Sequence, residues 1–192
     1  MLKNTKKFAL NFKILRFLLI PAILVSTPFL NQIEYASAGL EFQWDQDSGY
    51  RRLKWFQKDN KRKFRNKIYF FLRPNDRKTD LLKINLAIPK SFKVTLNQKN
   101  ISLCKVKIGG FDSRTKCLEN IPADIEINTL ESSLREINIY PYSPIPANKD
   151  SYAIVTKITN PKRSGLYQFH SYGQPKGKSV STYLGSWTIV ID

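Results

Sequence analysis

Histidine, cysteine and methionine are all scarce in this chain. Its 192 residues include one histidine, His170, one methionine and two cysteines, Cys104 and Cys117. Zinc sites take most of their ligands from cysteine and histidine at short spacings, and no Cys-x-x-Cys occurs here. The sequence therefore argues against a metal centre, and we expect neither a metal nor another cofactor.

The motifs that mark common enzyme classes are missing as well. The sequence has no phosphate-binding loop, no dinucleotide-binding glycine pattern and no Gly-x-Ser-x-Gly nucleophile elbow. His170 alternates with Tyr167 and Phe169, which predicts a surface or edge histidine. Asp124 and Glu126 are of the type that forms a glycosidase pair, but they alternate with isoleucines as the solvent face of a strand does. We expect no enzyme and assign no catalytic residue.

Long apolar runs are confined to the N-terminal part. Residues 17–30 form an apolar stretch broken by two prolines, preceded by five basic residues and followed by a polar run that ends Ala36-Ser37-Ala38. This layout predicts a cleavable secretory signal peptide over residues 1–38, with cleavage between Ala38 and Gly39. The alternative is an uncleaved N-terminal anchor. We expect an exported protein of the periplasm, the outer envelope or the medium, with no transmembrane segment in its mature part.

Acidic residues are the minority charge. The chain has 15 Asp and Glu against 32 Lys and Arg, a formal net charge of +17. An exported protein of this charge is suited to anionic partners, such as envelope polysaccharide or lipid headgroups. Export makes these partners more plausible than nucleic acid, and no specific nucleic-acid binding is expected.

The positive charge is concentrated in residues 51–67, where nine basic residues are opposed by Asp59 alone. We interpret this run, with three basic residues that follow it, as a candidate anion-binding surface. The alternative is a solvated face that keeps the protein soluble. Trp55 and Phe64 are candidates for stacking on a ligand. The anion-binding candidates are Arg51, Arg52, Lys54, Lys61, Arg62, Lys63, Arg65, Lys67, Arg73, Arg77 and Lys78.

Both cysteines lie in the part expected to be exported. An even number of cysteines in an oxidising compartment is typical of a disulfide, and the turn residues between Cys104 and Cys117 allow a hairpin to bring them together. Alternation with Lys105 and Lys107 places Cys104 on the inward face of its strand. Two free thiols, or half of a metal site, are the alternatives that the sequence leaves open.

Most of the mature chain alternates apolar and polar residues with a period of two. The alternation runs through residues 82–88, 92–96, 104–108, 124–128 and 136–139, and further strands are expected at 67–72, 152–158, 166–171 and 182–191. Short strands without a long amphipathic helix predict an all-β fold: a single antiparallel β-sandwich, immunoglobulin-like in general architecture. We expect one domain over residues 39–192, made of an irregular aromatic and basic arm (39–66) and the sandwich (67–192).

Six tyrosines offer a second route to binding. They could line a shelf for stacking sugars on one sheet face, although tyrosine is also simply favoured in strands. The sequence does not separate these two explanations. The tyrosines are Tyr140, Tyr142, Tyr152, Tyr167, Tyr172 and Tyr183.

Several stretches together resemble one family. They include Phe42-Gln43-Trp44-Asp45, Ile108-Gly109-Gly110-Phe111, Ile121-Pro122-Ala123-Asp124, Ile139-Tyr140-Pro141-Tyr142 and Tyr183-Leu184-Gly185-Ser186-Trp187. On these residues the chain resembles the domain-of-unknown-function 2808 family of exported cyanobacterial proteins, over nearly the whole mature part. The resemblance implies a compact β-rich domain and an envelope location, and it brings no activity and no catalytic residue.

Three hypotheses follow. The first is a non-catalytic, envelope-associated binding module that uses its basic surface. The second is a structural or assembly protein that docks to another exported protein through exposed aromatic residues. The third is a hydrolase of envelope polysaccharide, which requires a cleft that holds two neighbouring carboxylates.

Overall fold

The computed structural model describes residues 49–110, 113–130 and 134–192. The expected signal peptide, its cleavage site at Ala38 and Gly39, and residues 39–48 of the expected arm lie outside the described residues. Within residues 49–110, 113–130 and 134–192, no helix is long and apolar enough to cross a membrane.

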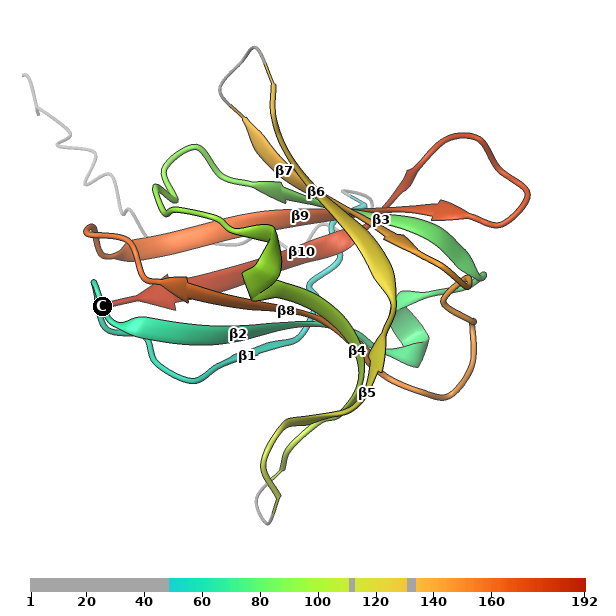
Figure 1. The fold of residues 1–192 in the computed structure, drawn as a ribbon, viewed down its shortest axis with the longest axis horizontal. Coiled ribbons are helices and arrows are strands. Elements are labelled where there is room, and N and C mark those ends of the chain that lie inside the picture. Colours follow the sequence, from blue (N-terminus) through green and yellow to red (C-terminus); the bar gives the residue numbers. More distant parts are fainter. Residues whose placement is uncertain (1–48, 111–112, 131–133) are drawn as a thin grey trace, which may run out of the picture. The chain divides into compact units, whose positions relative to one another are not determined.

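Ten strands in the described part of the chain form two antiparallel sheets (Figure 1). The first sheet has the order β1 (Trp55–Gln57), β2 (Arg65–Leu72), β8 (Tyr152–Thr159), β4 (Ile101–Lys107) and β5 (Lys116–Ile121). The second has the order β10 (Thr182–Ile191), β9 (Gly165–Pro175), β3 (Leu81–Ile88), β7 (Arg135–Pro141) and β6 (Ala123–Thr129). Two 3-10 turns, η2 (Pro74–Asp76) and η3 (Gln98–Asn100), lie in the connections. The predicted all-β sandwich is confirmed.

The main core fills the space between the two sheets. Alternate residues of each strand point into it, as the period of two requires. The fully buried Trp187 packs edge-on against Phe70 with ring centroids 5.1 Å apart, and Phe92 packs on Tyr167 and Phe169 at 4.9 Å each. These large side chains remove the most apolar surface from water and hold the sheets face to face.

A second apolar cluster lies on the opposite face of the first sheet. Its members alternate along β2, β8 and β4 with residues of the main core, and all are buried: Tyr69, Phe71, Cys104, Val106, Ala153 and Val155. Cys104 is therefore buried on the outer face of its sheet, and its predicted position on the inward face is wrong. Period-two alternation divides a strand into two faces, and it does not say which of two apolar faces meets the larger core.

The segment expected as an irregular arm has a defined structure over residues 51–62, here called the seam segment. Leu53 is buried and donates its N–H to the carbonyl of Ser186, at the edge of β10, while the N–H of Ser186 donates to Arg51. Residues 55–57 then form β1 beside β2, in the other sheet. The seam segment therefore joins the two sheets along one side of the sandwich.

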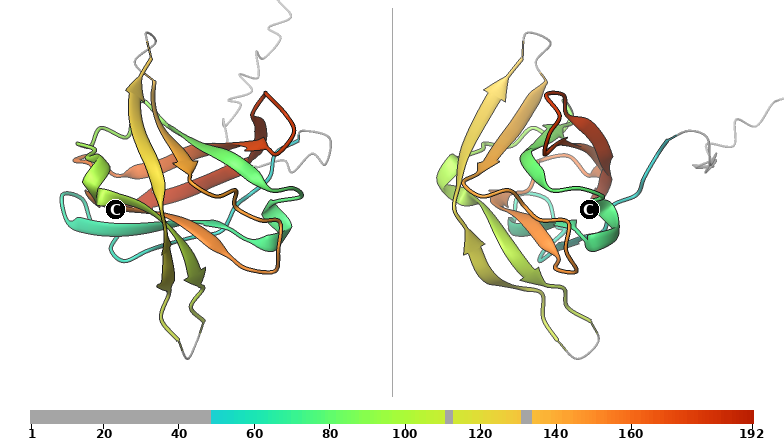
Figure 2. Two further views of the ribbon diagram at one scale, coloured as in Figure 1. Left: turned by 45° about the vertical axis from the view of Figure 1, so that its right-hand side comes forward. Right: turned by 90° about the vertical axis from the view of Figure 1, so that its right-hand side faces the viewer.

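The other side is closed by β5 and β6. Only Pro122 separates the two strands, so the chain passes directly from the first sheet into the second (Figure 1; Figure 2). A proline at such a corner loses no ladder hydrogen bond.

Two elements differ from the predicted strands. Residues 92–96 alternate in burial but do not pair with a strand, because the Arg135 guanidinium binds the carbonyls of Phe92 and Val94. The strand β5 was not expected, since its residues are exposed on both faces and show no apolar period.

Candidate functional site

The basic residues around the β1–β2 connection lie on a loop held by buried amides. Residues 58–64 form this basic loop. Asn66 and Asn160 are buried behind it and are joined by a hydrogen bond of 3.0 Å from Nδ2 of Asn66 to Oδ1 of Asn160. Asn160 Nδ2 also donates to the carbonyl of Lys61 at 2.8 Å, and Asn66 Oδ1 accepts the N–H of Asp59 at 3.0 Å. These hydrogen bonds fix the backbone of the loop, so its Lys and Arg side chains extend from defined backbone positions.

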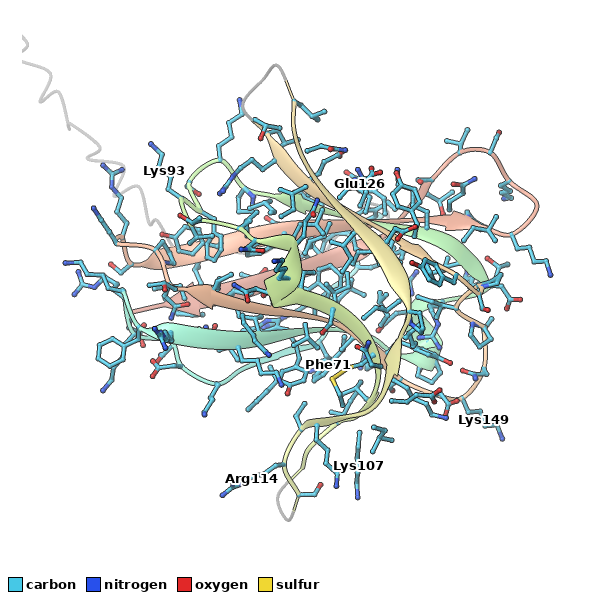
Figure 3. All side chains as sticks on the ribbon, in the orientation of Figure 1. Phe71, Lys93, Lys107, Arg114, Glu126 and Lys149 are labelled. Carbon is cyan, nitrogen blue, oxygen red and sulfur yellow. A yellow bond between two sulfur atoms is a disulfide. The ribbon has the colours of Figure 1, made fainter. Side chains whose placement is uncertain are left out.

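Other segments bring further cations to the same end of the sandwich. The N–H of Lys63 meets the carbonyl of Pro161, next to Lys162 and Arg163 in the β8–β9 connection. These two residues line a shallow groove together with Lys93, which Figure 3 shows at that end. We name this surface the basic end; it consists of Lys61, Arg62, Lys63, Arg65, Lys93, Lys162 and Arg163. Three of its members lie far from the basic run in the sequence.

The remaining anion-binding candidates lie elsewhere. β2 separates the basic loop from Arg73 and Lys78, and its eight residues span about 23 Å. Arg51 donates to the carbonyl of Asn75, beside this second group, and Arg73 pairs with Asp76 at 3.1 Å. Arg52 and Lys54 are exposed near the same end of β2. The expected single surface is thus divided into two groups of cations at opposite ends of β2, and Lys67 lies apart from both groups, on the strand itself.

Arg77 does not belong to either group. Its guanidinium is buried, donates to the carbonyls of Leu72 and Asp150, and lies over the Tyr152 ring at 4.6 Å. Burial lowers the pKa of Arg77, and the nearby Tyr152 partly offsets that shift. The expectation that Arg77 binds an external anion is wrong, because its guanidinium is buried and donates to backbone carbonyls of the fold.

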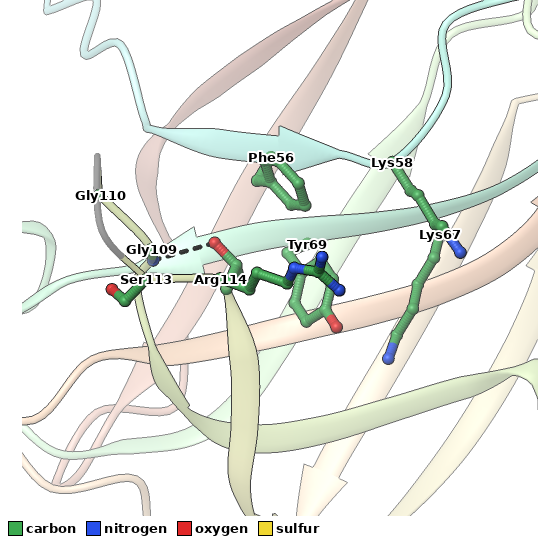
Figure 4. Close-up of a pocket in the computed structure, with 9 residues that line it drawn as sticks. Phe56, Lys58, Lys67, Tyr69, Gly109, Gly110, Ser113 and Arg114 are labelled. Carbon is green, nitrogen blue, oxygen red and sulfur yellow. Dashed lines mark hydrogen bonds between the residues drawn. The ribbon is translucent and has the colours of Figure 1, made fainter.

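A groove with an aromatic floor begins where the basic loop begins. It has a volume of about 920 Å³ and lies between the outer faces of β1 and β2 and the β4–β5 hairpin (Figure 4). The floor is formed by Phe56 and Tyr69, whose ring centroids are 6.0 Å apart. We name it the aromatic groove; its lining residues are Phe56, Lys58, Lys67, Tyr69, Gly109, Gly110, Ser113, Arg114 and Thr115.

Three cations surround this floor. Lys58 and Lys67 approach from the side of the basic loop, and the Lys67 ammonium lies 4.9 Å from the centre of the Tyr69 ring. Arg114 approaches from the hairpin, as Figure 4 shows. No carboxylate is among the lining residues that the structure describes. The groove therefore offers an apolar surface and positive charge together.

The aromatic candidates are placed differently from one another. Phe64 is 55% exposed, with the Lys61 ammonium 5.8 Å from its ring centre. Trp55 packs against the main core instead. Its neighbour Phe56 takes the outward position, because successive residues of β1 face opposite sides of the sheet. Alternation along the strand is the sequence signal that could have identified Phe56 as the outward residue, but β1 has only three residues and shows no period.

The β4–β5 hairpin that forms one wall of the groove carries the predicted disulfide. Cys104 and Cys117 are bonded, with Cα atoms 5.7 Å apart, and the prediction is confirmed. Near the turn, the N–H of Gly109 donates to Thr115 Oγ1 at 3.0 Å. A Cβ at Gly109 would come within 2.6 Å of the Ser113 carbonyl oxygen, so this position requires glycine.

The six tyrosines do not form one shelf. Tyr152 and Tyr167 are buried in the main core, and Tyr142 is exposed and donates to Asp124 at 3.0 Å. Tyr140, Tyr172 and Tyr183 share the outer face of the second sheet with His170. Asp124 and Glu126 lie on the exposed side of β6, as their alternation predicts.

Among residues 49–110, 113–130 and 134–192, no group of three or more His, Cys, Asp or Glu side chains is arranged to hold a metal ion.

Comparison with known proteins gives distant structural matches. BslA, a bacterial hydrophobin, is 13% identical, with 74% of this chain and 95% of that chain covered and a TM-score of 0.42. The collagen-binding domain of a Staphylococcus aureus adhesin is 13% identical, with 71% and 95% covered and a TM-score of 0.36. No curated protein matches the sequence.

The family comparison covers most of the chain. Residues 43–191 match the family described as "Protein of unknown function (DUF2808)". This match includes every strand of both sheets, the basic end and the aromatic groove. The chain therefore belongs to the DUF2808 family of proteins of unknown function.

Proposed function

We propose that this protein is an exported, non-catalytic module that binds an anionic polysaccharide of the cell envelope. The observation that carries the proposal is the aromatic groove, where Lys58, Lys67 and Arg114 surround a floor of Phe56 and Tyr69. The basic end continues this positive surface from Lys58 through the basic loop. The disulfide supports an exported location, since such bonds persist in oxidising compartments.

The groove favours a polysaccharide over a lipid surface. A sugar ring has an apolar face that can lie on the exposed Phe56, which packs on the buried Tyr69, while its carboxylate or sulfate group pairs with Lys58, Lys67 or Arg114. An anionic membrane attracts clustered Lys and Arg through its headgroups, and this attraction makes no use of the aromatic floor of the groove. Lys and Arg at the basic end then contact further charges along the same polymer.

The geometry does not favour hydrolysis. Glycoside hydrolysis uses two carboxyl groups about 5 to 10 Å apart across the scissile bond. The aromatic groove has none among its described lining residues, and the groove on the second sheet has one, Glu136. Docking to another exported protein, the second hypothesis, predicts association that does not depend on salt.

The test is binding of the purified protein to sodium alginate, a polyuronate, across a salt series. We expect affinity to fall steeply with salt, because binding releases counterions from the polymer. Removing the three charges Lys61, Arg62 and Lys63 is expected to weaken binding about tenfold at low salt and to flatten the salt dependence.

The matched control removes three charges elsewhere. Lys149, Lys176 and Lys178 are exposed outside both the basic end and the aromatic groove. Their replacement lowers net charge equally and should leave most of the affinity intact. Equal losses of alginate affinity in the two triple variants would show that net charge alone, and not the basic end, determines binding. Binding to phosphatidylglycerol vesicles but not to alginate would point to lipid, and salt-insensitive capture of an envelope protein would support docking.

A further inference from the structure

The outer face of the second sheet carries polar and aromatic side chains in ordered rows. The register places Glu136 of β7, Ala87 of β3, His170 of β9 and Ser186 of β10 side by side. The next row contains Asn138, Asn85, Tyr172 and Tyr183. Four strands thus present two parallel rows to one side, and none of these residues belongs to the basic end or the aromatic groove.

The polar groups of these rows are held in place by one another. Ser186 Oγ is buried, with His170 Nδ1 at 2.8 Å and the Tyr183 hydroxyl at 2.6 Å. The Tyr183 ring lies 5.7 Å from that of Tyr172 and 6.4 Å from that of His170. Ser186 therefore fixes the orientation of two aromatic side chains at the surface.

A second set of hydrogen bonds fixes the other side of the rows. Asn85 Nδ2 donates to Glu136 at 2.7 Å and to Asn138 Oδ1 at 2.8 Å, and Asn138 Nδ2 donates to Glu136 at 3.0 Å. The Lys83 ammonium lies 5.0 Å from the centre of the Tyr140 ring. In the part of the face described for β3, β7, β9 and β10, Glu136 is the one carboxylate and Lys83 the one ammonium, so the charge there is balanced. Asp124 and Glu126 lie beyond β7, on the outer strand β6.

Between these two sets the face is hollowed. A groove of about 440 Å³ is lined by His170, Tyr172, Gln168, Asn85, Glu136 and Lys83, among others. Ala87 lies between Glu136 and His170, which are two strand spacings, or about 10 Å, apart, and its methyl group leaves the space between them open. His170 Nε2 has no hydrogen-bond partner among the described residues, and Tyr172 is 36% exposed.

We propose that this groove, the tyrosine face, binds a neutral oligosaccharide. A pyranose presents an apolar ring face and several hydroxyl groups that both donate and accept hydrogen bonds. Tyr172 provides the stacking surface, and His170, Gln168 and Glu136 provide donors and acceptors around it. The described lining of this groove has one carboxylate, Glu136, and one ammonium, Lys83, and this balance favours a neutral ligand, in contrast to the positive aromatic groove. The prearranged side chains reduce the ordering that binding requires.

This inference does not depend on the proposed function, since the two sites use different sheets. Its test is a titration of the isotope-labelled protein with cellohexaose, maltohexaose and chitin hexaose, followed by NMR of the tyrosine and histidine side chains. We expect at least one hexaose to shift the signals of His170 and Tyr172 in a saturable manner. If none of the three does so, or if the shifts map to Phe56 and Tyr69, the proposal is overturned.

Variants of Tyr172 make the test specific. Tyr172→Leu keeps an apolar side chain but removes the ring, and should weaken binding at least about tenfold. Tyr172→Phe keeps the ring and should stay within about threefold of the unmodified protein. Tryptophan fluorescence, to which the buried Trp187 contributes, shows whether each variant is folded.

The matched control is Tyr142→Leu, on an exposed tyrosine away from the groove, which should leave affinity unchanged. An equal loss in Tyr142→Leu and Tyr172→Leu would overturn the assignment of the groove. Alginate added to the bound complex should not displace the hexaose, and displacement would contradict two separate sites.

Discussion

Gly185 determines how the seam segment meets the second sheet. Its φ of +147° lies in a region that side chains rarely adopt, and it interrupts the β9–β10 register between Tyr183 and Gly185. A Cβ there would come within 2.7 Å of the Arg51 carbonyl oxygen and of Leu53 Cγ. The glycine therefore lets Leu53 enter the core against the edge of β10.

Replacing Gly185 by alanine should destabilise the protein by about 2–4 kcal/mol, because both the backbone and its neighbours must move. Chemical denaturation followed by Trp187 fluorescence measures the change. Gly110→Ala is the control, since no atom of the described residues, apart from the chain neighbours of Gly110, lies within 4 Å of a Cβ at that position. Equal losses of unfolding free energy in the two variants would show that the close approach at Gly185 does not contribute to stability.

Glu136, on the tyrosine face, makes the stability of the fold depend on pH. Burial favours its protonated form, but the hydrogen bonds from Asn85, Asn138 and Asn128 and the charge of Lys83 together outweigh burial and lower the pKa of the carboxyl below 4.5. Because the folded state prefers the ionised form, this group stabilises the fold above its unfolded pKa and loses that contribution as the pH falls through its folded pKa.

The stability difference between the unmodified protein and Glu136→Gln should therefore be largest near neutral pH and shrink below pH 4.5. Unfolding free energies measured over a pH series test this expectation, and the other carboxylates cancel in the comparison. A difference that grows on acidification would contradict the sign of the shift.

At the scale of elements, β4 and β5 form a hairpin that depends on its disulfide. β5 buries little of its own surface, so the bond from the exposed Cys117 to the buried Cys104 is its main attachment besides the ladder. Closing a loop of this length contributes about 3 kcal/mol in the chain-entropy model.

Cys117→Ser should therefore lower the free energy of unfolding by about 3 kcal/mol and weaken alginate binding, because the hairpin forms one wall of the aromatic groove. The mass of the unmodified protein measured without reductant should lie two hydrogens below the reduced value. Two alkylated thiols in the native protein would contradict the bond itself.

Sequence patterns predicted the elements whose two faces differ in polarity. β3, β6 and β7 alternate because one side meets the core and the other meets water. The pattern failed where other forces act. Residues 92–96 alternate, yet Arg135 takes their carbonyls, and β5 pairs without burying a face.

The candidate site was less predictable, because surfaces assemble residues from distant segments. The sequence placed Lys61, Arg62 and Lys63 together, but not Lys162 and Arg163 beside them. It also gave no reason to separate Arg77, which is buried, from the exposed Lys78. Which cations come together and which one is buried both depend on how the strands pair, and the positions of charged residues in the sequence do not specify that pairing.

At the scale of the whole molecule, the positive charge acts against folding as well as for binding. The cations of the basic end repel one another, and repulsion between exposed charges weakens as salt screens it. The melting temperature should therefore rise between about 0.05 and about 0.5 M NaCl. The triple variant at Lys61, Arg62 and Lys63 should show a smaller rise, and an equal rise in both proteins would contradict repulsion at the basic end.

The seam segment has a consequence for how copies of the protein meet. A free strand edge is a template for pairing with another chain and so for aggregation. Here the seam segment already takes up backbone groups along the edge of β10. It bonds the N–H and carbonyl of Ser186, and Gln57 donates to the Val190 carbonyl. Next to β10, the N–H of Asp192 donates to the Asn60 carbonyl, and its carbonyl accepts from the N–H of Arg62. Of the other three edge strands, β1 has only three residues, and β5 and β6 carry charged side chains. At high concentration the protein should resist fibril formation. Its contacts with other molecules should be made by side chains, and no strand of another chain should be added to either sheet.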